Sequence, residues 1–281
     1  MIYYQTDRLT LHIGDALETL KQLPSNSVHT AITSPPYFNL CNYNVSGQMG
    51  LEETIPEYLS NLTAVFSEVR RILVNGGVFW VIIGDTVNNY SPIRGKGERR
   101  SPSFTIRRPM QEGYLEKEQI GIPSKLIESM RSVGWMFRRE LIWDKGTSGA
   151  IANSDTAPLT HESILQFCKW DGGGRPYLNC KKMRSSVLRY PAVSHQIHPC
   201  PFPAQLAREL LNASQKDGET VLDPFSGSGV SLFIGQERGH AIGVELNPEF
   251  CQVIRNHDRV SHLVGMGAIE QLSLMEVRSR D

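Results

Sequence analysis

Residues 28–37 read VHTAITSPPY, an apolar run that stops at two consecutive prolines. Proline fixes φ and has no backbone N–H to donate to a ladder, so a buried strand must end here and present the neighbouring residues at the edge of its sheet. These residues include the hydroxyl of Ser34, the carbonyl of Pro35 and the ring of Tyr37. We expect this proline motif, residues 33–37, to bind an amino group carried by a flat ring.

The proline motif suits the chemistry of the exocyclic amine of cytosine or adenine. That nitrogen is a poor nucleophile because its lone pair is delocalised into the ring. If Ser34 Oγ and the Pro35 carbonyl each accept one N–H bond, they favour a pyramidal nitrogen whose lone pair can point at an electrophile, while Tyr37 stacks on the base. An isolated Ser-Pro-Pro-Tyr string is more often a surface turn or a polyproline ligand, but this one directly follows an apolar strand.

Apolar runs and helical stripes alternate along the rest of the chain. The clearest helix begins with a capping-box spacing at 54–57 and carries an apolar stripe up to the glycine pair 76–77. The predicted strands are 10–13, 28–32, 78–83, 135–143, 163–168, 220–222 and 240–244. The other predicted helices are 16–23, 123–133, 230–237 and 248–260, and the segment 198–211 is expected to turn through three prolines into a further helix. This alternation predicts one large α/β domain with a doubly wound, largely parallel sheet.

A second motif lies near the carboxyl end of the chain. The strand 220–222 is followed by the glycine-rich turn DPFSGSG, residues 223–229, then by a helix and by a strand that ends at Glu245. This is the layout of a nucleotide-binding βαβ unit, with Glu245 placed to meet ribose hydroxyls. Asp223 would repel a pyrophosphate, and Leu232 replaces the third glycine of a dinucleotide motif. S-adenosylmethionine, which has ribose, adenine and a positive centre but no phosphate, fits better.

The composition of the chain limits the classes of partner and of cellular compartment that we expect. The 281 residues carry 29 Lys and Arg and 29 Asp and Glu, so the net charge indicates no partner. Five cysteines without a Cys-x-x-Cys pair favour reduced thiols in a cytoplasm. No apolar run approaches the ~18 residues of a membrane span, and no signal peptide is recognisable. We therefore expect a cytoplasmic protein without a membrane partner.

Three irregular segments remain. The loop 38–53 follows the proline motif, and we expect it to close over a bound base. The segments 86–118 and 171–197 are locally basic, a pattern typical of solvated loops and also of contacts with a phosphate backbone. The candidate DNA-binding residues in them are Arg94, Lys96, Arg99, Arg100, Arg107, Arg108, Lys181, Lys182 and Arg184.

Between residues 8 and 257 these motifs resemble those of the β-class amino-methylating DNA methyltransferases, which modify cytosine N4 or adenine N6. The resemblance implies a seven-stranded Rossmann-like methyltransferase fold with an antiparallel last hairpin at 135–143 and 163–168. It also implies a permuted motif order, in which the catalytic motif comes first, the donor motif comes last and a small irregular recognition insert lies between them. Serine in the first catalytic position resembles the cytosine-N4 branch.

The resemblance also assigns roles. It divides the domain into a catalytic half, 1–170, which includes the basic loop 86–118, a target-recognition segment, 171–197, and a donor-binding half, 198–281. The implied catalytic residues are Ser34, Pro35, Pro36 and Tyr37. The implied donor-binding residues are Asp15, Thr33, Phe202, Asp223, Phe225, Ser226, Gly227, Gly229 and Glu245. No metal is expected, because methyl transfer between these groups needs none.

We therefore expect a sequence-specific enzyme that methylates N4 of a cytosine flipped out of duplex DNA, in a restriction-modification system. A cognate restriction endonuclease and a second copy of the chain are candidate partners. The first alternative is adenine N6, followed by a methyltransferase for RNA, protein or a small molecule, and last by a non-catalytic DNA-binding module. Every methyltransferase hypothesis above requires that Ser34 and Gly227 share one cavity.

Two other chemistries fit the residues poorly. Carbon-5 methylation of cytosine needs a thiolate beside the catalytic strand, whereas Cys200 precedes the donor strand. His195, His198 and Cys200 lack a second ligand pair for zinc. The pair 161–162, His-Glu, is expected to be structural, although it stands at the start of a strand, where substrate contacts are common.

Overall fold

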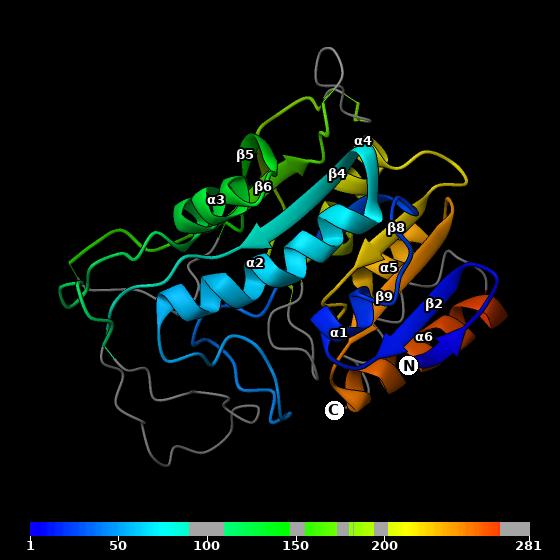
Figure 1. Cartoon of the computed structure of the whole chain (residues 1–281), viewed down its shortest axis with the longest axis horizontal. Helices are drawn as coiled ribbons and strands as arrows, with labels where there is room; N and C mark the ends of the chain where they lie inside the picture. The colour runs from blue at the N-terminus through cyan, green and yellow to red at the C-terminus, as the bar shows by residue number, and fades with distance from the viewer. Residues whose placement is uncertain (90–109, 147–154, 173–179, 182, 194–201, 265–281) are drawn as a thin grey trace.

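The computed structural model describes residues 1–89, 110–146, 155–172, 180–181, 183–193 and 202–264. Its strands are β1 (Ile2–Gln5), β2 (Leu9–Ile13), β3 (Val28–Thr33), β4 (Leu73–Ile83), β5 (Met136–Asp144), β6 (His161–Cys168), β7 (Val187–Arg189), β8 (Thr220–Asp223) and β9 (His240–Glu245). Within the described residues they form one nine-stranded sheet in the order β1-β2-β9-β8-β3-β4-β6-β5-β7 (Figure 1).

The centre of the sheet is parallel and one side of it is not. β2, β9, β8, β3 and β4 run parallel to one another, whereas β6 is antiparallel to both β4 and β5. The antiparallel hairpin predicted at 135–143 and 163–168 is therefore confirmed. All seven predicted strands occur, and together they make the expected Rossmann-like core.

Two edge strands were not predicted. β1 pairs antiparallel with β2, and β7 pairs parallel with β5. The prediction that the whole of 171–197 is irregular was therefore wrong for Val187–Arg189. Both strands are short and largely exposed, so neither leaves an apolar run in the sequence.

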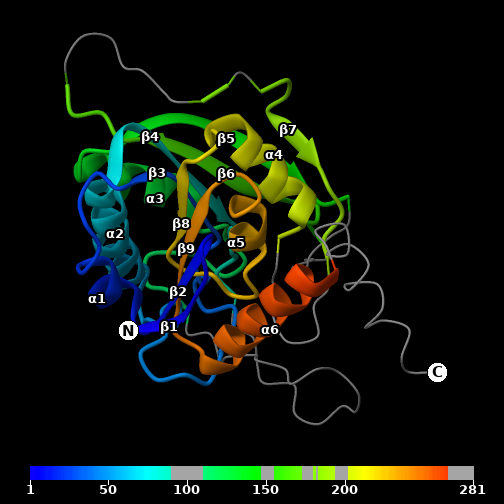
Figure 2. The same ribbon diagram turned by 90° about the vertical axis from the view of Figure 1, so that its right-hand side faces the viewer.

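Six helices lie within the described part of the chain, namely α1 (Ala16–Leu20), α2 (Ile55–Ile72), α3 (Ile122–Ser132), α4 (Ala204–Ser214), α5 (Val230–Gly235) and α6 (Pro248–Val264). Figure 2 shows α1, α2 and α3 on one face of the sheet and α4, α5 and α6 on the other. Phe79 of β4 packs in the core beside α2, and its neighbours Val78 and Trp80 pack beside α4. Burial on both faces explains the continuous apolar run of this strand. No helix in the described ranges is both long and apolar enough to cross a membrane.

The junction between α2 and β4 differs from the prediction. Thr54 caps α2 by accepting a hydrogen bond from the Glu57 N–H at 3.3 Å, as the capping box predicts. The helix ends at Ile72, however, and the strand begins directly at Leu73, with an irregular pairing before Val78. The glycine pair 76–77 therefore belongs to a bulge in the strand and does not end the helix.

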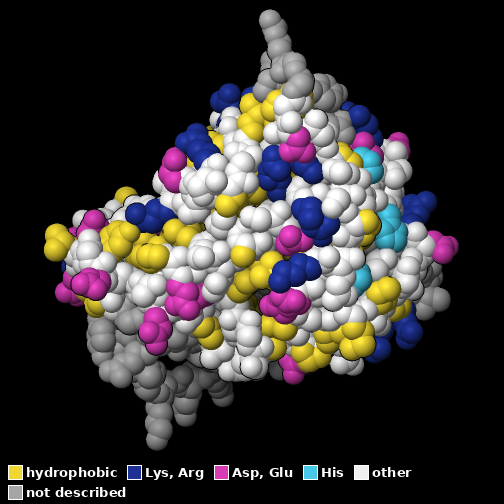
Figure 3. All heavy atoms as spheres, in the orientation of Figure 1, with side chains coloured by type: hydrophobic (Ala, Val, Ile, Leu, Met, Phe, Trp, Pro, Cys, Tyr) yellow, Lys and Arg dark blue, Asp and Glu magenta, His cyan; other side chains and the backbone are white. Residues whose placement is uncertain are grey.

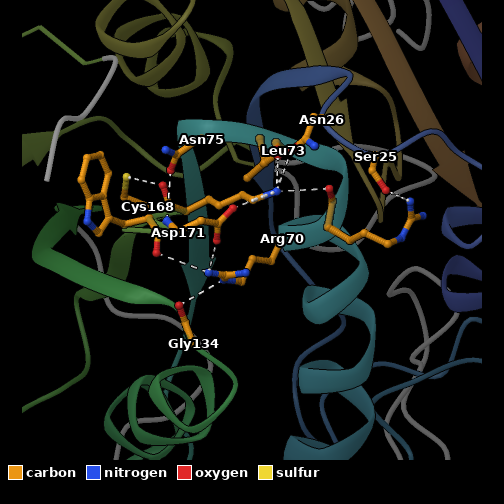
Figure 4. A network of polar contacts seen from close by, with 11 residues as sticks. Ser25, Asn26, Arg70, Leu73, Asn75, Gly134, Cys168 and Asp171 are labelled. Carbon is orange, nitrogen blue, oxygen red and sulfur yellow. Dashed lines mark hydrogen bonds and ion pairs between the residues drawn. The ribbon is translucent and has the colours of Figure 1, made fainter. Parts of the chain in front are cut away.

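A buried lysine links three segments at the end of the sheet where β4 begins. Lys169, which is 5% exposed, follows β6. Its Nζ donates to Asn26 Oδ1 and to the carbonyl of Leu73, each at 2.8 Å. Figure 4 shows Asn26 and Leu73 on one side of this network and Asp171 on the other. Since a buried ammonium group needs such partners, this residue ties the end of β6 to the start of β4 and to the turn before β3.

Replacing Lys169 with methionine should destabilise the protein. The change removes the buried donor to the Leu73 carbonyl and to Asn26 Oδ1, and we expect it to lower the free energy of unfolding by about 2–4 kcal/mol. Urea unfolding measures this quantity. Lys21→Met is the matched control, because Lys21 makes an exposed pair with Glu18, and it should leave the urea midpoint almost unchanged. Equal effects of the two substitutions would contradict this account of the network.

Candidate functional site

A cavity opens at the carboxyl ends of the parallel strands β2, β3, β8 and β9. The residues that line it come from five separate stretches of the chain. They are Gly14, Asp15, Ala16, Ser34, Pro36, Tyr43, Val45, Gly47, Gln48, Met49, Pro224, Phe225, Gly227, Val244, Glu245, Leu246, Asn247 and Phe250. We call it the β3–β8 cavity. It contains both Ser34 and Gly227, as the catalytic readings of the sequence require.

The Glu245 carboxylate is held at the wall of this cavity by backbone donors. The N–H of Gly227 donates to Oε2 at 2.7 Å, and the N–H of Asn247 donates to Oε1 at 2.8 Å. Burial raises the pKa of Glu245 to about 7. Each carboxylate oxygen has lone pairs left over, so the group can accept hydrogen bonds from two adjacent hydroxyls, such as those of a ribose.

The glycine turn allows this approach. Gly227 and Gly229 have φ of 51° and 85°, a region that favours glycine. A Cβ on Gly229 would lie 2.8 Å from Ile254 Cγ1 of α6. The turn therefore packs closely beneath the cavity while the Gly227 N–H faces Glu245.

Asp223 lies below the cavity and does not line it. It is 1% exposed, and its Oδ1 accepts from the Thr33 hydroxyl at 2.7 Å and from the N–H of Phe225 at 3.0 Å. The Ser231 hydroxyl donates to Oδ2. Burial raises the pKa of Asp223 to about 6. The structure thus places Asp223 and Thr33 as a link between the glycine turn and the proline motif, where the sequence predicted direct contacts with the donor.

Of the other predicted donor-binding residues, some line the β3–β8 cavity and others are buried beside it. Asp15 and Phe225 line the cavity, and Asp15 also caps α1 by accepting from the Glu18 N–H at 2.9 Å. Ser226 is 6% exposed and donates from its hydroxyl to the Asp223 carbonyl at 3.1 Å. Phe202 lies in the core beside α4 and does not line the cavity.

The loop after the proline motif lines the β3–β8 cavity, a placement that the sequence did not predict. Tyr43 packs edge-on against Phe250 of α6, with the ring centroids 6.0 Å apart. Gln48 accepts from the Tyr43 N–H at 2.6 Å and donates to the Cys41 carbonyl at 3.0 Å. Loop 38–53 therefore forms a wall of this cavity. The apolar side chains within an otherwise polar loop were the available signal.

The proline motif stands between two cavities. Ser34 and Pro36 line the β3–β8 cavity, and Tyr37 lines a second one, the β4–β6 cavity, whose other lining residues include Phe38, Asp85, Gln119, Ile122, Lys145, His161 and Glu162. Pro35 is buried between them. The Tyr58 hydroxyl donates to the Pro36 carbonyl at 2.8 Å and fixes the motif from the α2 side.

A chain of polar contacts runs from Ser34 into the second cavity. The Ser34 and Tyr37 hydroxyl oxygens are 3.2 Å apart, and the Tyr37 hydroxyl donates to Glu162 Oε2 at 2.6 Å. Lys145 Nζ donates to Glu162 Oε1 at 2.8 Å. The prediction treated the 161–162 pair as structural, whereas Glu162 contacts the motif directly.

Two of the candidate DNA-binding residues lie in the described part of the chain. Arg94, Lys96, Arg99, Arg100, Arg107, Arg108 and Lys182 lie outside the described residues, as do His195, His198 and Cys200. Lys181 and Arg184 are described and exposed, and the Lys181 N–H donates to the Ala213 carbonyl of α4 at 2.7 Å. On the face that Figure 3 shows, Lys and Arg are scattered among acidic and neutral side chains. Among the described residues, no group of three or more His, Cys, Asp or Glu could hold a metal ion.

Known proteins resemble both the sequence and the fold. The model of the N6/N4 DNA methylase family matches residues 28–256. The Type II methyltransferase M.XycI of Xanthomonas campestris pv. cyanopsidis is 34% identical over 258 residues, which cover 86% of this chain and 84% of the relative.

Two solved structures are similar to the whole fold. The putative DNA modification methylase TTHA0409 of Thermus thermophilus, complexed with S-adenosyl-L-methionine, has a TM-score of 0.62 at 26% identity and covers 91% of this chain and 95% of its own. The PvuII DNA methyltransferase (cytosine-N4-specific) has a TM-score of 0.67 at 18% identity, with coverage of 90% and 87%, and shows the fold alone. The expected methyltransferase fold is thus confirmed.

The β3–β8 cavity fits the donor of that family. Its lining within the described residues has two carboxylates, Asp15 and Glu245, and no Lys or Arg, which suits a cationic ligand without phosphate. Glu245 is placed for a ribose, and Phe225 and Phe250 offer apolar surface. Together with the family match over most of its length, this site shows that the chain belongs to the N6/N4 DNA methylase family, as a β-class amino-methyltransferase.

Proposed function

We propose that this protein is a Type II enzyme that methylates the exocyclic N4 of cytosine in duplex DNA, as part of a restriction-modification system. The observation that carries the proposal is the position of Ser34, which lines the donor cavity while its hydroxyl is joined to Tyr37. Serine in this position supports cytosine over adenine. The name of M.XycI supports the Type II assignment.

In this proposal the residues of the chain promote the reaction by holding the target amine in a fixed position. The target base must leave the duplex to reach the cavity, which costs a few kcal/mol. Ser34 Oγ and the Pro35 carbonyl then accept the two amine N–H bonds, and the ring of Tyr37 stacks on the base. S-adenosylmethionine supplies an electrophilic methyl group when bound. The rate gain comes from alignment and from fixed dipoles around the amine.

Other assignments stay predictions. They are the division into 1–170, 171–197 and 198–281, the DNA contacts of the two basic segments, a cytoplasmic location, a homodimer and a cognate endonuclease. Adenine N6 is the second candidate for the target, since the family includes both activities. Methylation of RNA, protein or a small molecule would use the same donor cavity, and a non-catalytic DNA-binding module would not require it.

Mass spectrometry of nucleosides tests the target. Duplex DNA of mixed sequence is incubated with the protein and S-adenosylmethionine, then digested to nucleosides, with RNA treated in parallel. We expect N4-methyldeoxycytidine from the DNA and no methylated product from the RNA. N6-methyldeoxyadenosine alone would replace cytosine with adenine as the target, and a product from RNA alone would overturn the assignment to DNA.

A further inference from the structure

We propose that Glu162, held by Lys145, sets the direction of the hydrogen bonds through Tyr37, so that Ser34 Oγ meets the substrate amine as an acceptor. Glu162 and Lys145 are then positioning residues for the methyl transfer. The inference rests on the proposed function, because it assumes that an amine N–H reaches Ser34.

The geometry forms one continuous chain of four side chains. Lys145 Nζ lies 2.8 Å from Glu162 Oε1, Glu162 Oε2 lies 2.6 Å from the Tyr37 hydroxyl, and that hydroxyl lies 3.2 Å from Ser34 Oγ. The side chains of Lys145 and Glu162 are 14% and 13% exposed, so water screens this pair less than an ordinary surface pair. The two ends of the chain lie in different cavities, Lys145 in the β4–β6 cavity and Ser34 in the β3–β8 cavity.

The chemistry of the four groups allows one direction of donation. An ammonium group donates only, and an ionised carboxylate accepts only, so the Tyr37 O–H must point at Glu162. The single hydroxyl proton of Tyr37 is then engaged by Glu162, and the Tyr37 oxygen can accept a hydrogen bond from the Ser34 hydroxyl. With its own proton directed at Tyr37, Ser34 Oγ keeps its lone pairs for the N–H of an incoming amine.

The backbone holds this chain rigidly. Glu162 pairs with Trp143 in the β5–β6 ladder, and the Lys145 N–H donates to the Thr160 carbonyl at 2.9 Å. At the end of β4, a Cβ on Gly84 would lie 3.0 Å from Tyr37 Cε2 and 3.7 Å from Glu162 Cγ. The tyrosine ring therefore rests directly on the glycine backbone beside the carboxylate. Such packing suits a group whose orientation has to be set in advance.

Glu162→Gln tests the direction with little change in shape. A glutamine whose Oε1 accepts from Lys145 turns its amide N–H₂ towards Tyr37, and the tyrosine proton is then free to point at Ser34 and occupy its acceptor site. We expect kcat for methylation to fall about 10- to 100-fold. The dissociation constants of S-adenosylmethionine and of DNA should change by less than about twofold, as measured by calorimetry and by a binding titration. Glu162→Asp should restore part of kcat.

A double-mutant cycle separates this role from simple stabilisation. Tyr37→Phe removes the hydroxyl that transmits the effect, so Glu162→Gln should have almost no further effect on kcat in the Tyr37→Phe background. The matched control is Glu209→Gln, which removes the carboxylate that accepts from the Tyr190 hydroxyl at 2.5 Å on the α4 side of the sheet. It should leave kcat within about twofold of wild type.

Two outcomes would overturn the inference. One is a wild-type kcat in Glu162→Gln, and the other is the same loss of kcat in the Tyr37→Phe background as in the wild type, which would indicate a structural ion pair only. Failure of the proposed function looks different, because the wild-type protein itself would then yield no N4-methyldeoxycytidine from DNA.

Discussion

Replacing Ser34 with alanine is expected to lower kcat for methylation by about 10²- to 10³-fold, the usual effect of losing one group that aligns and polarises a reacting centre. Ser34 lines the β3–β8 cavity, but its hydroxyl bonds to Tyr37 and does not hold Glu245 or the glycine turn. The donor site should therefore survive, with a dissociation constant for S-adenosylmethionine within about twofold of wild type.

Calorimetry with the donor and a methylation assay measure these two quantities on the same preparations. Ser67→Ala is a suitable control, because its hydroxyl donates to the Thr63 carbonyl within α2, away from both cavities. That variant should retain wild-type kcat. If Ser34→Ala abolished donor binding, the separation between the acceptor site and the donor site would be wrong.

The second large effect is expected at Glu245. Glu245→Ala removes the carboxylate that the N–H groups of Gly227 and Asn247 hold at the cavity wall. Loss of hydrogen bonds between this charged group and the ribose should weaken donor binding by about 100-fold, as two charge-assisted bonds of ordinary strength would predict. Isothermal calorimetry measures the change, and a dissociation constant close to wild type would refute the assignment of Glu245 to the ribose.

Donor binding should also depend on pH in the wild type. The pKa of Glu245 is raised to about 7 by burial, so the carboxyl group is ionised above this pH and protonated below it. Hydroxyl donors of a ribose favour the ionised form, and affinity for S-adenosylmethionine is therefore expected to be full above about pH 8 and to fall as the pH drops through about 7. Glu245→Gln should remove this part of the dependence.

The core of the sheet was predictable because its strands are buried on both faces. Such strands appear as uninterrupted apolar runs, and the residues that follow them are brought to one edge by parallel pairing. Hence Ser34 and Gly227, far apart in the chain, could be expected in one cavity. The edge strands left no such pattern. Ile2 of β1 is 53% exposed and Val187 of β7 is 36% exposed, so apolar residues of these strands face solvent, and neither sequence alternates between apolar and polar residues.

Contacts between distant side chains were beyond the reach of local patterns. Glu162 bonds to Tyr37 across 125 positions, and no spacing rule connects the start of one strand with the turn after another. The same holds for Asp223. An aspartate at this position suggested a contact with the ligand. Its burial and its hydrogen bond with Thr33 show instead that it links two segments of the protein. Residue type predicted which groups gather at the site, and only the fold decided which of them line it.

The buried Asp223 carboxylate has a mechanical consequence. It is shared by Thr33 at the end of β3, by Phe225 in the turn and by Ser231 on α5. We therefore expect the proline motif and the glycine turn to move together, so that these hydrogen bonds help to fix the distance between the proposed amine site and the proposed donor site. A substitution that breaks the Asp223 hydrogen bonds should let this distance vary. It should therefore lower both donor affinity and kcat, whereas Ser34→Ala is expected to lower kcat and Glu245→Ala to lower donor affinity.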